Sequence, residues 1–266
     1  MSVESDEPIR LTRDGSVATI WLNRPMKRNA LSYAMWSRLG KLATNLGEDR
    51  ATRVVVLRGC GEHFCAGADI TEINVERSSS EPSFSAVVDS AETALAGIPK
   101  PTVAFISGDC IGGGCSIAID CDLRIATSEA RFGITPANLG IVYPTAALER
   151  AVHLVGPAGS KRLLFTGKLI DATEALRIGL VDEVVDRADG EARLATLTGV
   201  LATRSLLTQA ATKSMVSEIM THGHVPEPLE AHWRRVAATA PDSSEGVAAF
   251  VERRSPRFTW SGHDGD

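Results

Sequence analysis

Two hydrophobic periods alternate along the first two-thirds of the chain. Short continuous apolar runs, typical of buried strands, occur at 17–22, 54–57, 102–106 and 122–126. Apolar residues spaced three or four apart, typical of amphipathic helices, occur at about 33–46 and 84–95. Strands that alternate with helices in this way predict an α/β fold.

Capping residues mark the ends of two predicted helices. Ser32 precedes the pattern at 33–46 as an N-cap, and Gly47 stands where that helix would end. Farther along, Asp171 is followed three residues later by Glu174, and Gly179 would close that helix.

The pattern changes in the last third of the chain, which is helical almost throughout from about Gly190. We therefore divide the chain into an α/β core at 1–195, with the candidate site, and a C-terminal helical region at 196–266. The serine-rich stretch VERSSSEPSFS at 75–85 predicts a surface loop that could cover a site.

Composition excludes several classes of protein. The hydrophobic content of 44% is typical of a globular protein, and the net charge of −5 argues against nucleic-acid binding. The acidic start MSVESDEPIR does not resemble a secretory signal, and no apolar run is long enough for a membrane span. The five cysteines include no CxxC and are interpreted as reduced core thiols, which points to the cytoplasm. The histidine spacings give no support for a metal site.

Two segments place small residues directly after a predicted buried strand. They are HFCAGADI at 63–70 and GDCIGGG at 108–114. Turns of this kind leave backbone N–H groups unpaired, and two such groups aimed at one point would form an oxyanion hole. Each turn alone could be purely structural. Nucleotide binding is disfavoured, because neither GxGxxG nor GxxxxGK[ST] occurs.

Taken together and in order, these segments resemble the enoyl-CoA hydratase/isomerase (crotonase) superfamily. The resemblance extends over nearly the whole chain and is carried by six stretches: NRPMKRNALS, HFCAGADI, GDCIGGGCSIAIDCDLRIA, FGITPANLGIVYP, RLLFTGKLIDATEALRIGLVDEVV and EGVAAFVERRSPRF. It implies a spiral of ββα units with a C-terminal segment that assembles homotrimers, usually stacked as hexamers. It also implies an enzyme of acyl-CoA and fatty acid metabolism with no separate cofactor, since coenzyme A is part of the substrate.

By this resemblance, the backbone N–H groups of Ala68 and Gly113 would hold the thioester oxygen and stabilise an enolate. The substrate's close approach to the backbone would explain the glycines. The adenine and pantetheine parts would lie along Ala66, Asp69, Ile70 and Thr71, and Lys27 and Arg28 could reach the phosphates. Lys27 and Arg28 are equally compatible with a solvated turn.

The hydratase reaction requires two glutamates that this chain lacks. The corresponding positions are Ser116, two residues after the glycine triplet, and Ala137, in the next loop. The nearby acids have structural interpretations. Asp120 and Asp122 lie at a helix end, Asp69 resembles a turn or cap residue, and Glu149 lies beyond the loop.

The loop TPANLG followed by Tyr143 resembles the methylmalonyl-CoA decarboxylase branch, in which Thr135 and Tyr143 would line the acyl pocket. Loop packing is the alternative role for both residues. Losing CO₂ from a malonyl-type thioester creates the enolate directly, so no base is needed, and a glutamate would repel the substrate carboxylate. This chain departs from the branch that it resembles at two positions. That branch has a histidine where this chain has Ala68, and a glutamate where this chain has Ser116.

The sequence thus predicts a lyase that decarboxylates a short malonyl-type CoA, with Thr135, Tyr143 and Ser116 positioning the carboxylate and water or Tyr143 protonating the enolate. Two alternatives stay open: a hydratase or isomerase with a non-standard acid or base, and a non-catalytic acyl-CoA binder. Other thioester chemistry, such as hydrolysis, is a further possibility.

Overall fold

The computed structural model describes residues 7–73, 75 and 81–262. Its main sheet has six strands in the order β1-β2-β3-β4-β6-β9. Strands β1 and β2 pair antiparallel, and each later neighbour pairs in parallel. The strands span β1 (Ile9–Asp14), β2 (Val17–Leu22), β3 (Val54–Gly59), β4 (Thr102–Ile106), β6 (Leu123–Thr127) and β9 (Glu183–Val185).

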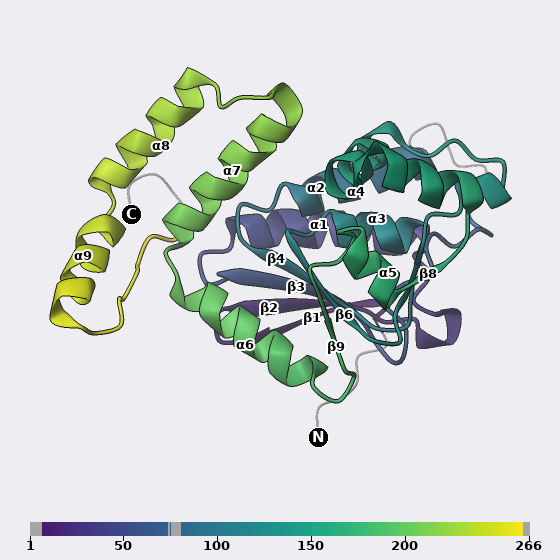
Figure 1. Ribbon diagram of the computed structural model, residues 1–266, viewed down its shortest axis with the longest axis horizontal. Coiled ribbons are helices and arrows are strands. Elements are labelled where there is room, and N and C mark those ends of the chain that lie inside the picture. The colour runs from purple at the N-terminus through teal and green to yellow at the C-terminus, as the bar shows by residue number, and fades with distance from the viewer. Residues whose placement is uncertain (1–6, 74, 76–80, 263–266) are drawn as a thin grey trace.

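Helices cover both faces of this sheet (Figure 1). One face is covered by α1 (Tyr33–Glu48), α2 (Phe84–Ala96) and α3 (Gly113–Ile119), with α4 (Thr145–Thr166) outside them. The opposite face is covered by α6 (Gly190–Thr203). The expected α/β fold with ββα units is confirmed.

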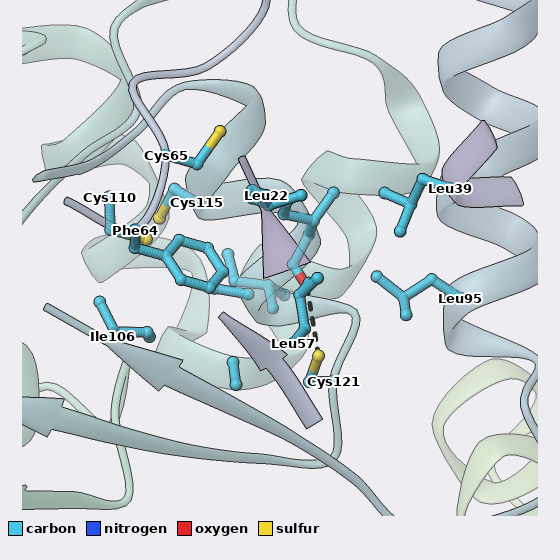
Figure 2. Packing of buried hydrophobic residues seen from close by; sticks show 14 of the residues in the cluster. Leu22, Leu39, Leu57, Phe64, Cys65, Leu95, Ile106, Cys110, Cys115 and Cys121 are labelled. Atoms are coloured by element: carbon cyan, nitrogen blue, oxygen red, sulfur yellow. Dashed lines mark hydrogen bonds between the residues drawn. The ribbon is translucent and has the colours of Figure 1, made fainter. Parts of the chain in front are cut away.

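Side-chain alternation along the strands divides the interior into two clusters. On β3, Val55 and Leu57 join the large cluster with Leu39 of α1 and Leu95 of α2. Val56 and its neighbours face the other side, where they pack against α6. Figure 2 shows Leu39 and Leu95 beside Leu57 in the large cluster.

Four of the five cysteines are buried as free thiols. Cys65, Cys110 and Cys115 lie around Phe64 in the large cluster, as Figure 2 shows. The interpretation of these residues as core thiols agrees with this packing.

The predicted helix caps are largely confirmed. Ser32 accepts a hydrogen bond from the Met35 N–H at 3.3 Å, and Asp171 accepts one from the Glu174 N–H at 2.8 Å. The predicted end at Gly47 is wrong, because α1 continues to Glu48. No left-handed residue is needed there, since Lys100 donates to the carbonyl oxygen of Leu46.

A second, three-stranded sheet holds the start of α3. Its order is β5 (Asp109–Ile111), β7 (Arg131–Gly133) and β8 (Ile170–Asp171). The Gly112 N–H donates to Gly133 O at 2.8 Å, so β7 fixes the residue before α3. The short helices η1 (Pro25–Lys27), η2 (Pro136–Asn138) and α5 (Ala172–Arg177) complete this part of the chain.

The last three helices extend away from the sheet (Figure 1). They are α7 (Leu206–His222), α8 (Glu227–Thr239) and α9 (Asp242–Glu252). Asp242 joins their ends, because its carboxylate accepts from Ser205 at 2.6 Å and from the Trp260 N–H at 3.2 Å. The division expected at residue 195 falls inside α6, which lies on the sheet.

Parts of two predicted segments lie outside the described residues. These are residues 76–80 of the serine-rich loop and residues 1–6 of the acidic start. Ser83 accepts a hydrogen bond from the Ala86 N–H, so the end of the serine-rich stretch caps and begins α2. Among the helices in the described ranges, none has the length and apolarity to cross a bilayer.

Candidate active site

Backbone hydrogen bonds bring the two glycine-containing segments side by side. Cys65 and Cys110 form an isolated parallel bridge. The Cys65 N–H donates to Asp109 O, and the Ile111 N–H donates to Cys65 O, both at 2.9 Å. The ends of both segments therefore meet beside the first turn of α3.

Ala68 forms an isolated parallel bridge with Leu31, and the N–H of Ala68 takes no part in the hydrogen bonds of that bridge. Leu31 N donates to Gly67 O, and Asp69 N donates to Leu31 O, each at 2.8 Å. In such a parallel bridge the central residue uses neither its own N–H nor its C=O. Within the described residues, the Ala68 N–H has no acceptor.

The N–H of Gly113 is the second unpaired donor. Gly113 is the first residue of α3, where no preceding turn supplies an acceptor, and within the described part of the chain its N–H is unbonded. A Cβ built on Gly113 would lie 3.5 Å from Ala68 N, so the two donors are neighbours. The structure thus brings together the two residues predicted to form the oxyanion hole.

Close packing between the segments gives the glycines a second function. A Cβ at Gly114 would lie 2.3 Å from Cys65 O, and one at Gly67 would lie 2.9 Å from Ile111 O. Neither position can hold a larger residue without moving backbone. The glycines were expected to make room for a substrate, but at these two positions the atoms that approach closely belong to the chain itself.

Ser116 and Tyr143 form a hydroxyl pair next to the two donors. Their oxygen atoms lie 2.6 Å apart. Ser116 is 3% exposed on α3, whereas Tyr143 is half-buried on the loop before α4. Burial raises the pKa of Tyr143 well above its usual value, so the phenol keeps its proton at neutral pH.

A buried glutamate that is not among the residues predicted from the sequence lies near this pair. Glu92 of α2 is 2% exposed, and Arg150 donates to its carboxylate at 3.1 Å. Burial raises the pKa of Glu92 to about 7, while Arg150 and a hydrogen bond with Ser116 oppose that rise. Glu92 is therefore a candidate acid or base close to Ser116.

Arg150 also contacts a second buried acid. Its Nε lies 2.5 Å from Oδ1 of Asp120, which is 5% exposed. Burial and the nearby Glu92 raise the pKa of Asp120 well above its usual value. One guanidinium thus faces two buried carboxyl groups, an arrangement that retains a proton at neutral pH.

Helical periodicity could have identified Glu92 from the sequence. The apolar stripe of the predicted helix at 84–95 runs through Val88 and Leu95. Glu92 is four residues after Val88 and three before Leu95, so it falls on that buried stripe. A carboxylate on an apolar stripe signals a buried partner, which here is Arg150.

Other residues expected near the acyl group do not join this cluster. Thr135 precedes η2, and its hydroxyl has no hydrogen-bond partner among the described residues. Ala137 is exposed. Asp122 binds Thr102 and Lys213, and Glu149 is exposed beside Arg150.

The residues assigned to coenzyme A lie on an exposed edge next to Ala68. Ala66 donates its N–H to Arg28 O at 2.9 Å, which holds the turn at 27–28 against this segment. Ile70 and Thr71 are exposed, as are Lys27 and Arg28.

Two of these side chains form ion pairs inside the protein. Arg28 pairs with the buried Asp109 at 3.1 Å, and Asp69 pairs with Arg24 at 3.2 Å. Asp69 also accepts from the Thr71 hydroxyl at 2.7 Å, as a turn residue does. In the part of the chain that the structure describes, the Lys27 ammonium has no ion-pair partner.

The family model for enoyl-CoA hydratase/isomerase matches residues 12–261. A Mycobacterium tuberculosis protein named "Probable enoyl-CoA hydratase echA8" is 33% identical over 95% of this chain and 98% of its own length. The crotonyl-CoA hydratase of Syntrophomonas wolfei is 32% identical over 95% and 98% of the two chains.

Solved structures are similar over the same extent. A crystal structure titled as an enoyl-CoA hydratase/carnithine racemase from Magnetospirillum magneticum has a TM-score of 0.90 and 32% sequence identity. The similarity covers 96% of each chain.

Proposed function

Because the chain belongs to the enoyl-CoA hydratase/isomerase family, we propose that it decarboxylates a short malonyl-type CoA thioester through an enolate. The observation that carries this proposal is the hydroxyl pair of Ser116 and Tyr143, 2.6 Å apart, at the place where a hydratase needs a carboxylate.

The enolate would be stabilised by the N–H groups of Ala68 and Gly113. Both donors are main-chain groups without another acceptor in the described residues, so they are available to a thioester oxygen. Hydrogen bonds to that oxygen strengthen as it gains charge, which selectively stabilises the transition state. Removing one such donor in other enzymes costs about 10²–10³ in rate.

Decarboxylation suits a site lined by hydroxyl groups, because the reaction needs hydrogen-bond donors for the carboxylate and no base. When CO₂ leaves, the electron pair of the broken C–C bond forms the enolate, so no proton has to be removed. The substrate carboxylate could accept hydrogen bonds from Ser116 or Tyr143, and an ionised glutamate at position 116 would repel it. Tyr143 keeps its proton and can later donate it to the enolate carbon.

Hydration or isomerisation of a short enoyl-CoA is the second candidate. It is favoured by the names of the curated relatives, among them the crotonyl-CoA hydratase of Syntrophomonas wolfei. Glu92 could then provide the non-standard acid or base, because its pKa of about 7 allows both protonation states at neutral pH.

Side-by-side incubation with methylmalonyl-CoA and crotonyl-CoA, followed by mass spectrometry of the products, tests both candidates. Propionyl-CoA without hydration of crotonyl-CoA supports decarboxylation. Rapid formation of 3-hydroxybutyryl-CoA overturns it in favour of hydration. Thioester binding without any product overturns both reactions and leaves a binding protein.

A further inference from the structure

A chain of polar side chains leads from the acyl site to a buried acid. We propose that Glu92 supplies a proton to the acyl site, and takes it back, through a relay formed by the Ser116 and Tyr143 hydroxyls. The inference rests on the proposed enolate chemistry and identifies the source of the proton that the enolate carbon receives.

The first part of the relay lies within one helical turn of the oxyanion hole. Ser116 is three residues after Gly113 on α3, so it lies on the same face about 4.5 Å along the axis. Its hydroxyl is 2.6 Å from that of Tyr143. Tyr143 lies on the loop before α4, and the proposal places its hydroxyl beside the bound acyl group.

The second part joins Ser116 to Glu92. Ser116 lies one helical turn before Asp120 on α3, and Arg150 contacts both Asp120 and Glu92, so the Glu92 carboxylate lies on the same side of α3 as Ser116. The Ser116 hydroxyl also lowers the pKa of Glu92. A serine hydroxyl donates one hydrogen bond and accepts others, so it can bind Glu92 and Tyr143 at the same time. Ser116 and Glu92 are 3% and 2% exposed, so little of either side chain contacts bulk water.

The groups around Glu92 adjust its proton affinity. Burial of Glu92 is the main cause of its raised pKa, Arg150 of α4 favours the carboxylate, and Asp89, on the same helix as Glu92, disfavours it. Asp120, at the end of α3, shares Arg150 and competes for its charge. The result is a pKa of about 7, close to the value at which a general acid or base works best at neutral pH.

Each proton transfer moves one hydrogen along the relay. The enolate carbon forms its new C–H bond with the Tyr143 proton, and the Tyr143 oxygen takes the Ser116 proton. Ser116 takes the Glu92 proton, and Glu92 remains as a carboxylate facing Arg150. A proton from bulk water restores Glu92 after the product leaves, so atoms and charges balance.

Deuterium exchange at the α-carbon of propionyl-CoA in D₂O measures this proton transfer without requiring decarboxylation or hydration. We expect the wild-type exchange rate to show an inflection near pH 7. Glu92→Gln should lose the inflection and slow exchange by about 10²-fold or more, with an unchanged half-saturating concentration. Glu92→Asp should recover part of the rate and an inflection. Glu149→Gln, an exposed change beside Arg150, is the matched control and should have no effect.

The outcomes separate the relay from the proposed reaction. A Glu92→Gln protein with the wild-type rate and inflection overturns the relay. No exchange by the wild-type protein overturns both the relay and the enolate chemistry. Exchange without decarboxylation or hydration overturns the proposed reactions and leaves the relay standing. If Glu92→Gln fails to fold, an exchange rate and an inflection in Glu92→Asp that are both identical to those of wild type overturn the relay.

Discussion

The indole ring of Trp36 fills the space beside Gly113. A Cβ added to Gly113 would lie 3.0 Å from Cζ2 of this ring, and Trp36 is buried on α1. Because the core is densely packed, an alanine at 113 must shift either the ring or the backbone that holds the N–H.

We therefore predict that Gly113→Ala lowers kcat/KM by about 10-fold, since the contact requires a shift of a few tenths of an ångström and a misplacement of about 1 Å can cost about 100-fold. Adding Trp36→Phe should restore part of the loss by freeing space. Gly199→Ala on α6 is the matched control, because a Cβ there meets no atom within 4 Å. Wild-type turnover by Gly113→Ala would contradict the assignment of this N–H.

The buried Glu92 should make folding stability depend on pH. Its pKa is about 7 in the folded protein against an ordinary value of 4.5, so the folded state binds an extra proton between these values. The stability contributed by the neutral form is complete below pH 4.5 and is lost as the pH rises to about 7. The expected loss is roughly 3 kcal/mol, since each pKa unit corresponds to about 1.4 kcal/mol.

Urea unfolding of wild type and Glu92→Gln at pH 4.5 and 7.5 measures this loss. The glutamine stays neutral at both pH values. The free energy of unfolding of Glu92→Gln, relative to that of wild type, should therefore be higher at pH 7.5 than at pH 4.5. Equal pH dependence in the two proteins would show that Glu92 ionises normally.

The stability of the C-terminal helices should depend on one buried carboxylate, that of Asp242. Asp242 accepts hydrogen bonds from Ser205, Thr259 and Trp260. Asp242→Ala should destabilise 205–260 by about 1–3 kcal/mol, because it leaves the buried Trp260 N–H and two part-buried donors without their acceptor. Hydrogen exchange should rise in α7 and α9 and stay unchanged in β3 and β4. Asp189→Asn, an exposed change at the start of α6, is the control.

An exposed apolar face on α9 should be covered by other copies of the chain. Val247, Phe250 and Val251 are 65%, 85% and 74% exposed. Light scattering should therefore give a mass of three or six times the 28.3 kDa of one chain. Phe250→Asp should reduce this mass, because a charge at a buried interface is costly. A monomeric wild-type protein would contradict the predicted trimer or hexamer.

Local patterns predicted the elements of the fold but not every contact between them. The strand at 102–106 and the caps at Ser32 and Asp171 follow from residues close together in the sequence. The end of α1 was misplaced because Lys100, far along the chain, binds the Leu46 carbonyl.

For the site too, features set by neighbouring residues could be predicted, whereas a contact between distant residues could not. The glycines at 67 and 113–114 marked the two backbone donors, because close backbone approach leaves a sequence signal. The partnership of Glu92 with Arg150 joins residues 58 positions apart, so no local pattern could specify it.

A site whose two predicted donors are main-chain atoms does not depend on the chemistry of the side chains at those two positions, provided that they fit the space. Every amino acid except proline carries the same N–H group, so exchanges at neighbouring positions can alter the reaction without abolishing enolate stabilisation. Such a scaffold is readily evolvable. Ser116→Glu with Ala137→Glu would be a short mutational path toward water addition, and successive variants along that path could retain measurable activity.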